Sequence, residues 1–115
     1  MKTDRELLEL AAKAAGIGPI LCYESARNCL RIGDRKSYKL WRPLHLYEDA
    51  MPMAVGLKLW VSVVNARGQK SGYAYVEFAD DFDVTELHGN HDGDANAATR
   101  RAIVRAAAEI GKAMP

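Results

Sequence analysis

The sequence predicts an α+β fold, a small antiparallel sheet of about four strands packed as a sandwich with N-terminal, central and C-terminal helices. Apolar residues recur with the helical period at both ends of the chain, and they alternate with the strand period in the middle. The predicted order is helix, small hairpin, short helix, hairpin, helix, which is typical of an antiparallel sheet packed on helices. The 115 residues suit one domain spanning 1–115.

The first helix has clear end signals. Thr3 and Glu6 in "TDRE" have the spacing of a capping box, in which each side chain bonds the other residue's backbone N–H. Gly16 is suited to the left-handed residue that ends a helix, and Pro19 prevents continuation. Between these ends, one apolar face is made by Leu7, Leu10, Ala11 and Ala14.

A small hairpin is expected from strand-like segments around 20–23 and 28–32, with a loop at 24–27. This register sets Cys22 opposite Cys29, close enough for a disulfide in an oxidising compartment. In a cytosolic protein we expect two reduced thiols, packed as small apolar strand residues. The stretch 33–37 reads as a turn, and 38–44 as extended or irregular because Pro43 disfavours helix before it.

A short second helix is predicted within 48–59, with Glu48 or Asp49 as its cap. Pro52 fits only in a first turn, where its missing N–H costs nothing, and Gly56 weakens or ends the helix. The last helix begins after Asp94, a good N-cap, and runs to about Ala113.

The second hairpin alternates on both strands. Leu59, Val61 and Val63 share one face of the first strand, and Trp60, Ser62 and Val64 share the other. The stretch 65–69 closes the hairpin, 83–87 adds a further strand or edge, and 88–94 is a loop. Trp60, Tyr73 and Tyr75 form a binding patch if helices cover only the other face, and core if helices cover both. The sandwich prediction favours core for Trp60.

Arg101, Arg105 and Lys112 lie opposite the apolar stripe of the last helix, with Arg100 on the flank. A solvated face is the first interpretation of such a stripe. Arginines near a helix N-terminus interact unfavourably with the helix dipole, so an acidic partner would explain the positions of Arg100 and Arg101. The segment 77–94, which is rich in carboxylates and lacks lysine and arginine, is an intramolecular candidate.

Opposite charges are segregated, although the net charge is only +1. Clustered carboxylates that could occupy a basic groove on a partner protein are Glu77, Asp80, Asp81, Asp83 and Glu86. The basic segment 27–42 combines cations with rings, a composition that suits single-stranded nucleic acid. Its candidate nucleic-acid-binding residues are Arg31, Arg35, Lys36, Lys39 and Trp41.

The chain shows no catalytic motif, so we expect no enzymatic activity and no cofactor. His88 and His91 could join the two cysteines around zinc, but the cysteine spacing is wider than zinc fingers use, so no metal is expected. There is no signal-peptide core and no apolar run long enough to cross a bilayer. These features predict a cytosolic protein without a membrane partner.

Three stretches, "DRELLELAAKAAGI", "WRPL" followed by "EDAMPMAVGLKLWV", and "ANAATRRAIVRAAAEIGKAMP", resemble small proteins of tailed phages and prophages with the phage ABA sandwich domain. The residues matching the middle of the family pattern are Trp41, Pro43, Leu44, Asp49, Ala50, Ala54, Val55 and Leu57. Pro52 and the turn "HLYE" depart from it. The resemblance implies a phage-encoded cytosolic αβα-type sandwich in the bacterial host, with no enzymatic activity to transfer.

Taken together, these features favour a non-enzymatic accessory protein that binds a host macromolecule. A host protein is the favoured partner, and a bacterial defence or regulatory system is its setting. One alternative is nucleic-acid binding through the basic segment. Another is a small-ligand-binding or sequestering protein, which needs a deep pocket lined by Tyr73, Tyr75 or His45. A homo-oligomer, paired through exposed hairpin edges about a two-fold axis, also stays open.

Overall fold

The computed structural model describes residues 2–64, 72–79 and 81–115, and confirms the α+β class. The elements in chain order are α1 (Asp4–Ala15), β1 (Ile20–Glu24), β2 (Cys29–Gly33), β3 (Tyr38–Trp41), α2 (Tyr47–Gly56), β4 (Trp60–Val64), β5 (Tyr73–Phe78), β6 (Phe82–Leu87), the 3-10 turn η2 (His88–His91) and α3 (Ala95–Ala113). In the described part of the chain, the strands form two three-stranded antiparallel sheets, β1-β2-β3 and β4-β5-β6. The expected single sheet of about four strands is therefore not matched. The turn expected at 65–69 lies outside the described residues.

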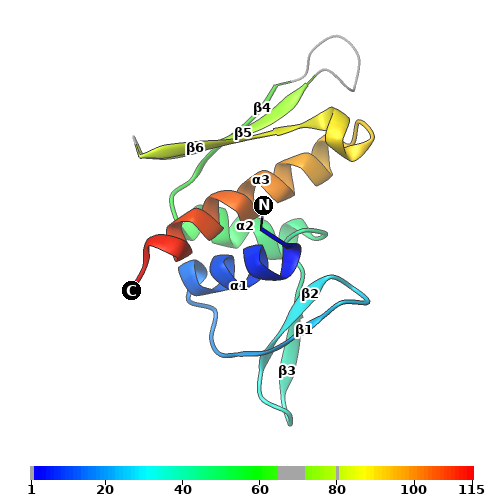
Figure 1. The fold of residues 1–115 in the computed structure, drawn as a ribbon, viewed down its shortest axis with the longest axis vertical. Helices are drawn as coiled ribbons and strands as arrows, with labels where there is room; N and C mark the ends of the chain where they lie inside the picture. Colours follow the sequence, from blue (N-terminus) through cyan, green and yellow to red (C-terminus); the bar gives the residue numbers. More distant parts are fainter. Residues whose placement is uncertain (1, 65–71, 80) are drawn as a thin grey trace.

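Helix α3 lies at the centre of the fold (Figure 1). It packs against the β4–β6 sheet on one side and along α1 on the other, and it also contacts α2. Because α3 has neighbours on both sides, it is buried around most of its circumference, including Val104 and Ala108. The small β1–β3 sheet lies beyond α1, at the opposite end of the molecule from the larger sheet (Figure 1).

The predicted helix ends are confirmed. Thr3 and Glu6 form the capping box, and Gly16 ends α1 in the left-handed conformation at φ 63°. Asp94 caps α3 by accepting hydrogen bonds from the backbone N–H groups of Asn96 and Ala97. These interactions satisfy donors that the first turn of a helix leaves without intrahelical partners, and they need only residues close in sequence.

A glycine allows α1 and α3 to cross closely. A methyl group built on Gly111 of α3 would overlap the backbone carbonyl oxygen of Leu10 in α1. Only a residue without Cβ fits there, so the two helix backbones approach more closely than larger side chains would permit.

The predicted cap of the second helix is wrong. Helix α2 begins at Tyr47, and its N-cap residue Leu46 makes no side-chain capping bond. Asp49 instead accepts a hydrogen bond from the backbone N–H of Arg42, at 2.9 Å. The earlier start places Pro52 inside the helix rather than in its first turn, where it removes one helical donor.

The predicted strand register, which set Cys22 opposite Cys29, is also wrong. Glu24, not Cys22, is paired with Cys29, while Cys22 is paired with Arg31, and both thiols are free. The loop is shifted because Asn28 adopts a left-handed conformation at φ 50°. Its side chain is held by two hydrogen bonds, one from the Tyr23 hydroxyl at 2.6 Å and one to Asp4 at 2.7 Å. The stretch expected to be extended or irregular begins with the regular strand β3.

Candidate functional site

One face of the β4–β6 sheet is covered by α3, and no helix of the described residues packs on the other. Alternation along the strands turns Ala74, Val76 and Val84 toward α3, where they are buried. The opposite set, which we name the outer face, consists of Trp60, Ser62, Val64, Tyr73, Tyr75, Glu77, Asp83, Thr85 and Leu87. Strand register brings these residues, which are distant in sequence, onto one surface.

The outer face carries aromatic and apolar side chains in contact with solvent. Trp60 is 67% exposed, Leu87 is 50% exposed, and Tyr73 and Tyr75 are half-buried. The expectation that Trp60 belongs to the core is wrong, because no described helix packs on this side of the sheet (Figure 1). The Trp60 indole N–H donates to the Ser62 hydroxyl at 2.9 Å, which holds the ring along its own strand.

Two of the predicted acidic residues share this face with the aromatic rings. Glu77 is paired with Trp60 on one side and with Asp83 on the other, and Tyr75 lies next to both carboxylates. Burial, followed by the negative charges of Asp83 and Glu77, raises the pKa of Tyr75, so its hydroxyl stays protonated and can donate. Asp81 is exposed in the turn before β6, and Asp80 lies outside the described residues.

Glu86 differs from the other predicted acidic residues because it points toward α3 and is 8% exposed. Arg105 donates to its carboxylate at 2.5 Å, and His91 Nε2 lies 2.8 Å from it. Arg101 approaches to 3.8 Å. A carboxylate occupied by these three side chains is not free for a partner, so Glu86 does not belong to the outer face.

Arg101 and Arg105 of α3 therefore have an intramolecular acidic partner, so their face is not only a solvated one, although the Arg105 side chain is 40% exposed. Arg101 also bonds Asp4 of α1 at 2.9 Å. Burial would raise the pKa of Asp4, but hydrogen bonds from Arg101 and Asn28 hold it below its ordinary value. Arg100 packs over the Tyr47 ring, 5.0 Å from its centroid, and donates to a backbone carbonyl. These contacts join α3 to β6, α1 and α2.

The basic segment lies on the other sheet. Arg35, Lys36 and Lys39 are exposed on and beside the β2–β3 turn. Arg31 pairs with Glu24 at 3.4 Å and stacks over the Tyr38 ring at 5.1 Å. Trp41 is 2% exposed, so it cannot stack on a base as the nucleic-acid interpretation requires. It packs in the core instead, in one cluster with Leu30 and Leu44.

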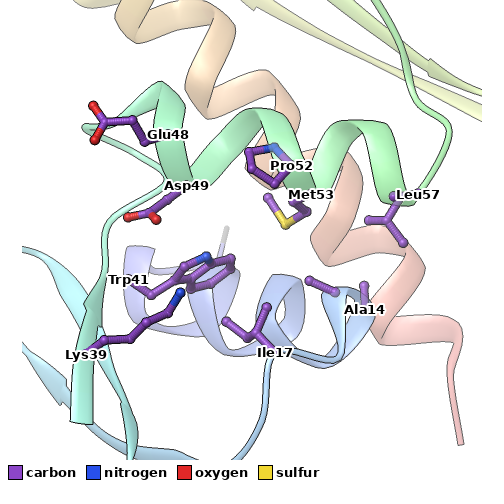
Figure 2. A pocket seen from close by; sticks show the side chains of 11 residues that line it. Ala14, Ile17, Lys39, Trp41, Glu48, Asp49, Pro52, Met53 and Leu57 are labelled. Carbon is purple, nitrogen blue, oxygen red and sulfur yellow. The ribbon is translucent and has the colours of Figure 1, made fainter.

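Trp41 also closes a hollow between α1, β3 and α2 (Figure 2). The hollow has a volume of about 370 Å³ and an apolar floor that includes Ile17, Met53 and Leu57. Lys39, Glu48 and Asp49 supply its polar groups. A second, more polar hollow of about 620 Å³ follows β6 and includes Arg101 and Arg105. Neither of these two hollows is lined by the residues expected for a ligand pocket, Tyr73, Tyr75 and His45.

His88 and His91, the histidines of the predicted loop, both make contacts within the protein. His88 is buried at 2% exposure, and its backbone N–H donates to Gly72. His91 bonds Glu86. In residues 2–64, 72–79 and 81–115, no group of three or more His, Cys, Asp or Glu side chains is arranged to hold a metal ion. Within the same ranges, no helix is long and apolar enough to cross a membrane.

Comparisons with known proteins bring no relatives: no protein-family model, curated protein or solved structure matches the chain. The outer face is therefore assigned from geometry. Sequence alternation grouped Trp60 with Ser62 and Val64, but it did not bring Asp83, Thr85 and Leu87 onto the same surface. The alternation of residues 82–87 contained this information. Phe82, Val84 and Glu86 face α3, so the residues between and after them face the other way.

Proposed function

We propose that the protein is a non-enzymatic binding protein that uses the outer face to hold a basic surface of another protein. The observation that carries this proposal is exposed Trp60 on the same sheet face as Tyr75, Glu77 and Asp83, a face on which none of the described helices packs. Aromatic side chains supply much of the binding energy at protein interfaces. Carboxylates at their border favour lysine and arginine on the partner and accelerate encounter.

The partner in this proposal is a bacterial host protein, and the chain is phage-encoded. Occupying the basic surface would inhibit a defence or regulatory system that uses this surface. This setting rests on the resemblance of the terminal and central stretches to the phage ABA sandwich domain. The binding mode rests separately on the outer face, so the two parts can fail independently.

The test is capture of host proteins from a nuclease-treated lysate by the tagged chain, followed by affinity measurement with the protein retained. Trp60→Ala is expected to weaken binding at least about 30-fold, since interface anchors contribute about 2 kcal/mol or more. Glu77→Gln combined with Asp83→Asn is expected to slow association and reduce its dependence on salt.

Tyr38→Ala is the matched control, because Tyr38 is an aromatic strand residue of the other sheet and is 45% exposed. It should leave the affinity unchanged. Equal binding by Trp60→Ala and wild type, or a loss confined to Tyr38→Ala, would contradict the proposed surface.

A second candidate function is nucleic-acid binding by the β2–β3 turn, favoured by the exposed cations Arg35, Lys36 and Lys39. Tyr38 would supply the stacking ring, since Trp41 is buried. Fluorescence anisotropy with a single-stranded oligonucleotide tests it: affinity should fall steeply as salt rises, and Lys36→Glu should weaken it further. Absence of binding at low salt would exclude this candidate.

A further inference from the structure

Among the residues that the structure describes, strand β4 is hydrogen-bonded to a single neighbouring strand. It lies at the edge of the β4–β6 sheet and is hydrogen-bonded to β5. In the described part of the chain, no backbone hydrogen bond joins β4 to any other element. Alternate N–H and C=O groups of an edge strand point away from the sheet, so β4 presents a row of them that can pair with another strand.

The edge also lacks the features that normally prevent such pairing. Its sequence, "WVSVV", contains no charged residue, proline or glycine. Trp60 is 67% exposed, Val63 46% and Val64 39%, so apolar surface accompanies the open backbone groups. The other edge strand, β6, is protected: Arg105 donates to the Thr85 carbonyl at 3.0 Å.

We infer that β4 pairs antiparallel with β4 of a second copy of this chain, about a two-fold axis that passes between the two Ser62 residues. This register sets Ser62 opposite Ser62 of the second copy. Trp60 then lies opposite Val64 of the second copy, and Val61 opposite Val63. Each apolar side chain meets an apolar side chain, and no like charges face one another across the axis, so the strand is complementary to itself. A two-fold interface requires this property.

The pairing produces one continuous six-stranded sheet with both α3 helices on the same side. The two outer faces then form a single surface with a Trp60 at each side of the axis. This inference goes beyond the proposed function: the dimer can be measured without any host protein, and it makes the binding surface two-fold symmetric.

Sedimentation equilibrium of the purified chain over low- to high-micromolar concentrations tests the inference. The wild type should approach twice the 12.7 kDa mass of one chain. Ser62→Lys and Ser62→Asp should each raise the dimer dissociation constant at least about tenfold, because each places like charges directly opposite one another. An equimolar mixture of the two variants should regain the dimer, since lysine then faces aspartate. Thr85→Lys, an exposed change on the same face away from β4, is the matched control and should leave the dimer intact.

A wild type that stays monomeric at the highest concentration overturns the inference, whatever the variants do. A dimer that persists in both Ser62 variants places the interface elsewhere and also overturns it. A monomer that binds a host protein and protects the β4 amides from hydrogen exchange would show that β4 accepts a foreign strand. That outcome would reject self-pairing while leaving the proposed function standing.

Discussion

Replacing Glu86 by glutamine removes one negative charge from a buried carboxylate that is paired with two arginines of α3. Glu86 is 8% exposed and binds Arg105 at 2.5 Å and His91 at 2.8 Å. The glutamine keeps the shape and one acceptor oxygen. It loses the charge that balances Arg105 and contributes to balancing Arg101, whose second partner is Asp4.

The expected cost follows from these contacts. A net hydrogen bond to a charged group stabilises a fold by about 1.5–3 kcal/mol, and Glu86 makes two short ones. The Arg105 side chain is 40% exposed, so solvent screens part of its contribution, and the glutamine retains some bonding. We therefore expect a loss of about 2–3 kcal/mol in the free energy of unfolding. At roughly 4 °C per kcal/mol for a domain of this size, Tm should fall by about 8–12 °C.

Urea denaturation followed by circular dichroism measures this loss, with Asp83→Asn as the matched control. Asp83 lies on the same strand but on the outer face and is exposed, so the same chemical change should alter stability by less than about 0.5 kcal/mol. In partner binding the order should reverse: Asp83→Asn should weaken the affinity, and Glu86→Gln should leave it unchanged. Equal stability of the two variants would refute the assignment of Glu86 as an internal ion-pair partner.

Two further predictions concern α1. Gly111→Ala should destabilise the fold by about 2 kcal/mol or more, because the added methyl overlaps the Leu10 carbonyl. The control Gly56→Ala, where the space is open, should be neutral or slightly stabilising. Equal urea midpoints of the two variants would contradict the close crossing of α1 and α3. The pKa of Asp4 is lowered on folding, so its contribution to stability is complete above its ordinary value of about 3.8 and is lost as pH falls through the lower folded value. Asp4→Asn should make the urea midpoint fall less between pH 5 and about pH 2, and an unchanged pH dependence would show that the pairing with Arg101 does not contribute.

The helix ends could be predicted because their interactions are local. The Thr3–Glu6 capping box, the left-handed Gly16 and the Asp94 cap involve residues within a few positions of one another. Helix α2 was predicted less well, since the side chain expected to cap it bonds the backbone of Arg42 instead. This hydrogen bond reaches back to a residue before the helix, which the local capping pattern does not reveal.

Strand alternation was predicted correctly for β4 and β5, but the face in contact with the core was not. Period-two alternation states which residues share a face, and it is silent on whether a helix covers that face. For Trp60 this distinction separates a core residue from a binding residue. Likewise, the two cysteines lie on neighbouring strands as expected, but the turn at Asn28 set a different register.

The sequence by itself determined the α+β class, the limits of α1 and α3, and the groups of residues that lie on the same strand face. It did so because capping and periodicity depend on neighbours along the chain. The tertiary structure decided that α3 is central, that Glu86 is held by Arg101 and Arg105, and that Trp60 faces solvent. These outcomes depend on which surfaces pack together, a choice made by burial of apolar area between elements that are far apart in the chain.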